Sequence, residues 1–113
     1  MYTESEVIKI VAELCNGVAP LFPQSKIEAT LFGSYARGDA QPGSDIDVLL
    51  LVDTSREDIS ARNWQVGDHA AEFLMKHGIM ISPIVENRDY FNANLEVLPF
   101  YRNVDREGVR VSI

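Results

Sequence analysis

The sequence predicts an α/β (α+β) fold in which one small mixed β-sheet is flanked by helices. Two observations carry this prediction. Segments with apolar residues at helical spacing alternate along the chain with short segments typical of strands. Glycine and proline residues stand near several of the junctions between them, where they favour turns. This alternation is typical of helices that pack on a sheet and cover it.

The first two elements are a helix and a strand. Residues 4–18 carry Val, Ile and Leu at helical spacing, and we expect Cys15, which lies in this pattern, to be buried in the core. Pro20 and Pro23 end the helix. Residues 26–32 alternate between polar and apolar side chains, as a short strand does.

Two turns and a second strand follow. Residues 33–38 predict a turn with one or two helical turns, and Pro42-Gly43 is a strong turn signal. Residues 45–52 predict a strand. Its later half is apolar at every position, which is typical of a central strand covered on both faces.

The rest of the chain predicts another helix, two strands and a short helix. Pro83 indicates that the strand containing it lies at an edge or a bulge. Trp64 lies off the clear apolar face of its helix, so it is either half buried or an anchor for a partner. The expected elements are a helix over residues 57–77, a strand over 79–85, a short helix over 88–94, irregular structure over 99–107 and a strand over 109–111.

Composition limits the function classes. The chain has 113 residues, 46% of them hydrophobic, so we expect residues 1–113 to form a single domain and not a disordered chain. The longest apolar run, residues 48–52, is far below the ~20 residues of a membrane span. The formal charge of −7 argues against direct nucleic-acid binding and suits a basic protein partner or a cation. With one cysteine and an acidic, polar start, we expect a cytoplasmic location.

The strongest functional signal is Gly33-Ser34 followed, after ten residues, by Asp45-Ile46-Asp47. In a strand, positions 45 and 47 point to the same face, which places two carboxylates side by side. Their mutual repulsion is relieved by a divalent cation, and Mg²⁺ takes carboxylate and phosphate oxygens. Gly33 allows close backbone approach, and free N–H groups with the Ser34 hydroxyl form an anion site. This layout suits phosphoryl or nucleotidyl transfer.

Each half of this motif, taken alone, also has a plain structural explanation as turn capping or solvated surface. It is the combination at this spacing that points to chemistry. Two neighbours remain open. Arg37 could face the same anion site or pair with Asp39 or another local carboxylate, and Ser44 is either a turn residue or a hydrogen-bonding group near the phosphate.

The stretches 31–38 and 43–48 together resemble the signature of the polymerase-β-like nucleotidyltransferase superfamily, and the short chain resembles its minimal nucleotidyltransferase (MNT) domain. The resemblance implies that Gly33 and Ser34 hold a nucleoside triphosphate and that Asp45 and Asp47 hold Mg²⁺. In prokaryotes such domains commonly pair with HEPN-domain proteins as antitoxin and toxin. The activity implied is the transfer of AMP, from ATP, to a tyrosine of the toxin, within a homo- or hetero-oligomer.

The sequence departs from that family at one point. Fully active members supply a third carboxylate from a later strand, whereas residues 79–85 contain no acid. Glu86, just beyond this predicted strand, is the nearest candidate for a third metal ligand. Whether the chain is an enzyme therefore stays open. It is a nucleotidyltransferase acting on a partner protein, a nucleotidyltransferase-like module that neutralises its partner by contact, or, as a third option, an enzyme acting on a small molecule.

Overall fold

The computed structural model describes residues 1–112 and confirms a small mixed sheet flanked by helices. The four strands lie in the order β3-β2-β1-β4. β1 pairs antiparallel with β2 and with β4, and β2 runs parallel to β3. The strands are β1 (Glu28–Phe32), β2 (Ile46–Val52), β3 (Ile81–Asn87) and β4 (Val109–Val111). The helices are α1 (Glu4–Val18), α2 (Ser34–Arg37), α3 (Arg56–His77), α4 (Arg88–Ala93) and α5 (Pro99–Glu107), with a short 3-10 helix, η1 (Ala19–Leu21).

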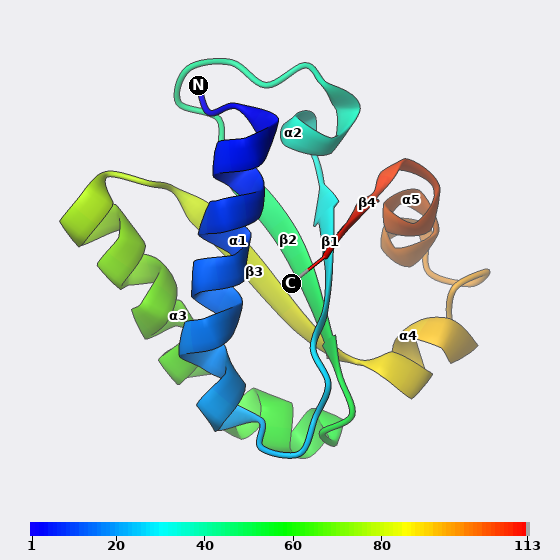
Figure 1. The fold of residues 1–113 in the computed structure, drawn as a ribbon. Helices are drawn as coiled ribbons and strands as arrows, with labels where there is room; N and C mark the ends of the chain where they lie inside the picture. The colour runs from blue at the N-terminus through cyan, green and yellow to red at the C-terminus, as the bar shows by residue number, and fades with distance from the viewer. Residues whose placement is uncertain (113) are drawn as a thin grey trace.

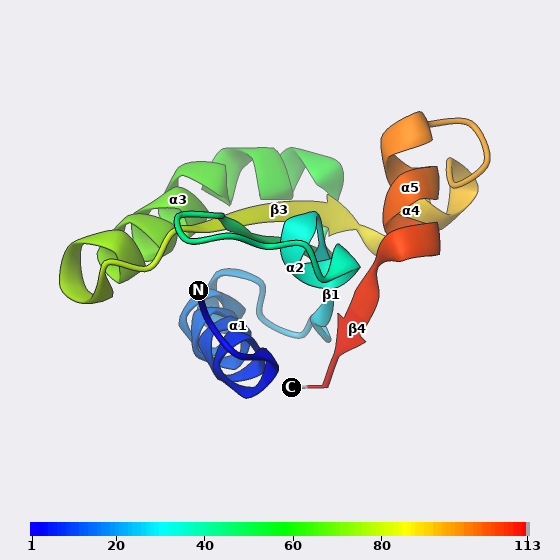
Figure 2. The same cartoon turned by 90° about the horizontal axis from the view of Figure 1, so that it is seen from above.

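The central strand β2 is covered on both faces, as its apolar sequence predicts. Alternate side chains of a strand point to opposite faces. Val48 and Leu50 pack in one cluster with α1 and α3, whereas Leu49 and Leu51 pack in a second cluster with α4 and α5. Each of these four side chains is 5% exposed or less. Seen from above, α1 and the α4–α5 pair lie on opposite sides of the strands (Figures 1 and 2).

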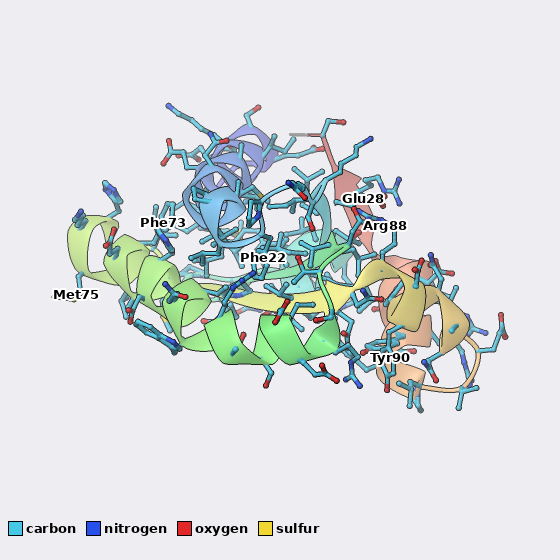
Figure 3. The ribbon with its side chains drawn as sticks, turned by 90° about the horizontal axis from the view of Figure 1, so that it is seen from below. Phe22, Glu28, Phe73, Met75, Arg88 and Tyr90 are labelled. Carbon is cyan, nitrogen blue, oxygen red and sulfur yellow. The ribbon has the colours of Figure 1, made fainter. Side chains whose placement is uncertain are left out.

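The larger cluster contains the buried face of α1. Thr3 caps this helix in a reciprocal capping box with Glu6, which satisfies two backbone donors of the first turn. Cys15 is buried as expected, and burial raises the pKa of its thiol to about 11. Phe22, just after η1, lies at the centre of the side chains between the helices and the sheet, whereas Met75 projects outward from the end of α3 (Figure 3).

Several predicted elements need correction. Residues 99–107, predicted to be irregular, form α5: Pro99 stands in its first turn, where no N–H partner is needed, and Tyr101 and Val104 bury one face of the helix. β1 and β3 begin two residues later than predicted, and β3 extends to residue 87. Trp64 is 67% exposed, so it is not half buried.

The edge position that Pro83 predicts for its strand is confirmed, because β3 is an outer strand of the sheet. At the far end of the sheet from α2, Arg88 ties the start of α4 to the neighbouring strands. Its guanidinium contacts Glu28 at 2.9 Å, pairs with Asp53 and donates to the carbonyl oxygen of Lys26 at 2.7 Å (Figure 3). Over residues 1–112, no helix is both long and apolar enough to span a bilayer.

Candidate functional site

The motif residues meet where β1 ends and β2 begins. Antiparallel pairing places Phe32, the last residue of β1, opposite Asp47 on β2. Gly33 follows immediately and leads into α2, which lies beside this end of the sheet (Figure 1). The pairing of the two strands thus brings the glycine-serine turn and the second aspartate of the motif to one place.

Gly33 packs directly against the Asp47 side chain. Its backbone has φ +74° and ψ −155°, a conformation that is essentially restricted to glycine. A Cβ atom added to Gly33 would collide with Oδ2 of Asp47 and lie 3.2 Å from its Cγ. Glycine is therefore required here for two separate reasons, the backbone conformation and the close approach of a carboxylate.

Arg37 and Ser44 both have partners within the protein, in the loop after α2 and, for Arg37, also at the end of α5. The Arg37 Nε donates to Asp39 at 3.2 Å, and its guanidinium lies 3.9 Å from Glu107. The Ser44 hydroxyl accepts a hydrogen bond from the backbone N–H of Gln41 at 2.9 Å. Ser44 thus acts as a turn residue, and Arg37 forms the local ion pair that the sequence left as one of two alternatives.

The electrostatic environment disfavours charge on Asp47. Burial raises the pKa of Asp47 above its ordinary value, the nearby Asp45 carboxylate raises it further, and Arg37 partly opposes both effects. A cation bound between the two carboxylates would remove this repulsion. Asp47 lies within β2 and Asp45 immediately precedes this strand, which begins one residue later than predicted, so the backbone keeps the two carboxylates close to each other.

The neighbouring strand places Ser82 beside the pair. Because β2 and β3 are parallel and in register, Ser82 lies opposite Asp47. The Ser82 hydroxyl donates to Oδ2 of Asp45 at 3.1 Å. Sequence reasoning named Ser82 only as a strand residue. The register of the parallel β2–β3 pair singles it out, and the sequence carries no local signal of that register.

Glu86, predicted as a possible third metal ligand, does not lie at this site. It pairs with Leu51, four positions beyond Asp47 along the strand, which is roughly 13 Å at strand spacing. Its carboxylate is buried, accepts a hydrogen bond from the Tyr101 hydroxyl at 2.5 Å and pairs with Arg56 at 3.2 Å. The prediction failed because β3 runs parallel to β2, so its last residues lie at the opposite end of the sheet.

The donor set fits one hard cation that arrives with a substrate. Within residues 1–112, no group of three or more His, Cys, Asp or Glu side chains is arranged to hold a metal ion. Two carboxylates and a hydroxyl remain at the motif. Mg²⁺ commonly binds to one or two carboxylates and takes its other ligands from water and substrate phosphates. Asp45 and Asp47 therefore suit a magnesium–nucleotide complex better than a permanently held metal.

Comparison with known proteins assigns the family. Residues 8–102 match the family described as "Nucleotidyltransferase domain". The chain belongs to this nucleotidyltransferase family. Two relatives from Methanocaldococcus jannaschii bear the name "Putative protein adenylyltransferase". One is 35% identical over 100 residues (88% of this chain and 92% of the relative), and the other is 36% identical over 107 residues (94% and 99%).

A solved structure supports the same fold. It is described as "Crystal structure of the toxin-antitoxin with AMP-PNP", and its matching chain superposes with a TM-score of 0.58 at 18% identity, covering 93% of this chain and 72% of that one. In this nucleotidyltransferase domain, the fold packs Gly33 against Asp47 and places Asp45 just before β2. Ser34 and Arg37 are the first and last residues of α2, Ser44 lies in the loop before Asp45, and Glu86 lies at the other end of β3.

Proposed function

We propose that this chain binds a nucleoside triphosphate with Mg²⁺ and transfers its nucleoside monophosphate, AMP from ATP, to a hydroxyl group of a partner protein. The observation that carries the proposal is the packing of the Asp47 carboxylate against Gly33. It joins the phosphate-binding turn to the aspartate pair within a nucleotidyltransferase domain. The names of the two archaeal relatives favour a protein as the acceptor and an adenylyl group as the group transferred.

The reaction requires one bond to form and one to break. The acceptor oxygen bonds to the α-phosphorus, the bond from that phosphorus to the oxygen bridging the β-phosphate breaks, pyrophosphate leaves, and the hydroxyl proton passes to solvent. When bound, Mg²⁺ neutralises the charge of the phosphates and of the leaving group. Gly33 and Ser34 hold the triphosphate, and Asp45 and Asp47 hold its cation.

Arg37 is available to take part. Its side chain is 46% exposed, and its ion pairs with Asp39 and Glu107 are exposed as well. Such surface pairs contribute about 0–1 kcal/mol, so breaking them to contact a phosphate costs little. The Ser44 hydroxyl, which accepts the Gln41 N–H, contributes by fixing the loop that precedes Asp45.

The partner we propose is a helical toxin of the HEPN type, with this chain as its antitoxin. The solved structure of similar fold comes from a toxin–antitoxin, crystallised with a non-hydrolysable ATP analogue. The net charge of −7 favours a basic partner and a hetero-oligomer. ATP and Mg²⁺ are both present in the cytoplasm, where we propose that the pair acts.

A second candidate function is neutralisation by contact alone. It is favoured by Ser82, the residue that β3 places beside the aspartates, because this residue is neutral and β3 brings no third carboxylate to the motif. In that case the chain binds nucleotide without efficient transfer. The two functions differ in whether the aspartates are needed for neutralisation.

Radiolabelled ATP separates the two functions. We would incubate the chain with a candidate partner of the HEPN type and with ATP labelled at either the α- or the γ-phosphate. Nucleotidyl transfer puts α-label but no γ-label on the partner, and Asp45→Asn and Asp47→Asn abolish it. Asp68→Asn, an exposed acid on α3, is the matched control and leaves transfer unchanged. Neutralisation that survives both motif substitutions without any transfer overturns the enzyme and leaves the contact function.

A further inference from the structure

Ser82 is an uncharged residue that lies beside the aspartate pair. It faces the same side of the sheet as Asp47, its partner across the parallel β2–β3 pair. Its hydroxyl donates to Oδ2 of Asp45 at 3.1 Å, so it is already engaged with one of the two carboxylates. It lies on β3, an outer strand of the sheet, and is half buried.

A neutral group at this position limits how much positive charge the site can hold. Sites that hold two divalent cations place them about 3.5–4 Å apart, and the repulsion between them must be offset by anionic ligands. Here the motif offers two carboxylates, and residues 1–112 contain no third acidic, histidine or cysteine ligand that joins them. The hydrogen bond donated by Ser82 also occupies a lone pair on Oδ2 of Asp45, which is then not available to a second cation.

We propose that Ser82 makes this a one-metal site. The chain holds the cation that travels with the nucleotide and has no place for a second one against the acceptor hydroxyl. Ser82 is then a positioning residue that orients Asp45 toward that single cation. This inference rests on the proposed function, because it assumes that a metal–nucleotide complex binds at the motif.

The metal count is measurable without any transfer reaction. We would dialyse the full chain against Mn²⁺ and the non-hydrolysable α,β-methylene analogue of ATP. The ratio of bound Mn²⁺ to bound nucleotide is then determined by electron paramagnetic resonance and absorbance. The wild type is expected to give a ratio of one. Ser82→Asp supplies a third carboxylate and is expected to give a ratio of two, whereas Ser82→Asn, of the same size as Asp but neutral, stays at one.

Each outcome decides between specific claims. A wild-type ratio of two, or a folded Ser82→Asp variant that remains at one, overturns the one-metal site while leaving the proposed function intact. A wild type that binds no nucleotide overturns the proposed function and this inference together. Circular dichroism at saturating Mn²⁺ checks that Ser82→Asp is folded. If that variant does not fold, the wild-type ratio alone still confirms or refutes the one-metal site.

Discussion

Gly33→Ala tests whether the turn and the aspartate pair form one site. The structure separates two effects of the added methyl group. The backbone conformation at φ +74° and ψ −155° is strained for any residue with a Cβ, which costs about 1–3 kcal/mol. The methyl also overlaps Oδ2 of Asp47, the free end of a side chain that can rotate away. The collision therefore adds little to instability but moves a proposed metal ligand.

Gly38→Ala is the matched control at the other end of α2. Gly38 also has a positive φ, +82°, but a Cβ added there meets nothing within 4 Å. Its expected cost is about 1–2 kcal/mol for the left-handed conformation alone. The two variants are thus similar in stability and differ in whether Asp47 is displaced.

The assay has two readouts, urea unfolding and Mg²⁺-dependent binding of a fluorescent ATP analogue. We expect the free energy of unfolding of both variants to fall by about 1–3 kcal/mol, so that both unfold at a lower urea concentration than the wild type. Only Gly33→Ala is expected to lose nucleotide binding. If Gly33→Ala binds the nucleotide as tightly as Gly38→Ala does, the contact between the turn and Asp47 has no functional role, and the reasoning is refuted.

Three further predictions concern charge and stability. Without metal, Asp47→Asn should raise the free energy of unfolding at pH 7 by about 0.5 kcal/mol after solvent screening. The cause is the raised pKa of Asp47 in the folded protein: the contribution of Asp47 to stability falls as the pH rises above the unfolded value of 3.8, so urea melts should show a larger gain for the variant over the wild type at pH 7 than at pH 4. Arg88→Ala removes one of the two arginine partners of Glu28 and leaves the carbonyl groups of Lys26 and Leu51 without this donor, so it should lower stability by about 1–3 kcal/mol, measured by the same melts; an unchanged midpoint would contradict the role of Arg88 in linking α4 to the strands. Tyr101→Phe removes a donor to the buried Glu86 and should cost about 1–3 kcal/mol at neutral pH. Burial and then Glu86 raise the pKa of Tyr101, so the stability it provides is fully present below pH 10 and lost as the pH rises further; the variant should lose less stability above pH 10, and equal losses would count against this.

Local patterns in the sequence were enough for the central strand and the motif. The apolar run of residues 48–52 predicts a strand covered on both faces, and the structure places Val48 and Leu49 in separate clusters on the two sides. The motif spacing predicts a turn facing two carboxylates, and the packing of Asp47 against Gly33 agrees with this geometry. Both conclusions depend on residues close together in the chain.

The features that sequence reasoning missed depend on long-range packing. The parallel register between β2 and β3 decides that Ser82, and not Glu86, lies beside the aspartates, and no local pattern contains that register. α5 was missed because only Tyr101 and Val104 bury its inner face, too few apolar positions to show a helical period. Tyr101 is buried by contacts with α4 and with Glu86, which lie outside residues 99–107 and so do not appear in the local sequence of α5.

The most direct test of the central claim is to locate a bound metal–nucleotide complex by nuclear magnetic resonance. Substoichiometric Mn²⁺ with the α,β-methylene analogue of ATP broadens amide signals near the ion. We predict that the signals of Ser34, Asp47 and Ser82 disappear first, whereas that of Glu86, at the opposite end of the sheet, persists. Broadening spread over the acidic surface of the protein, or centred away from these residues, would contradict the account.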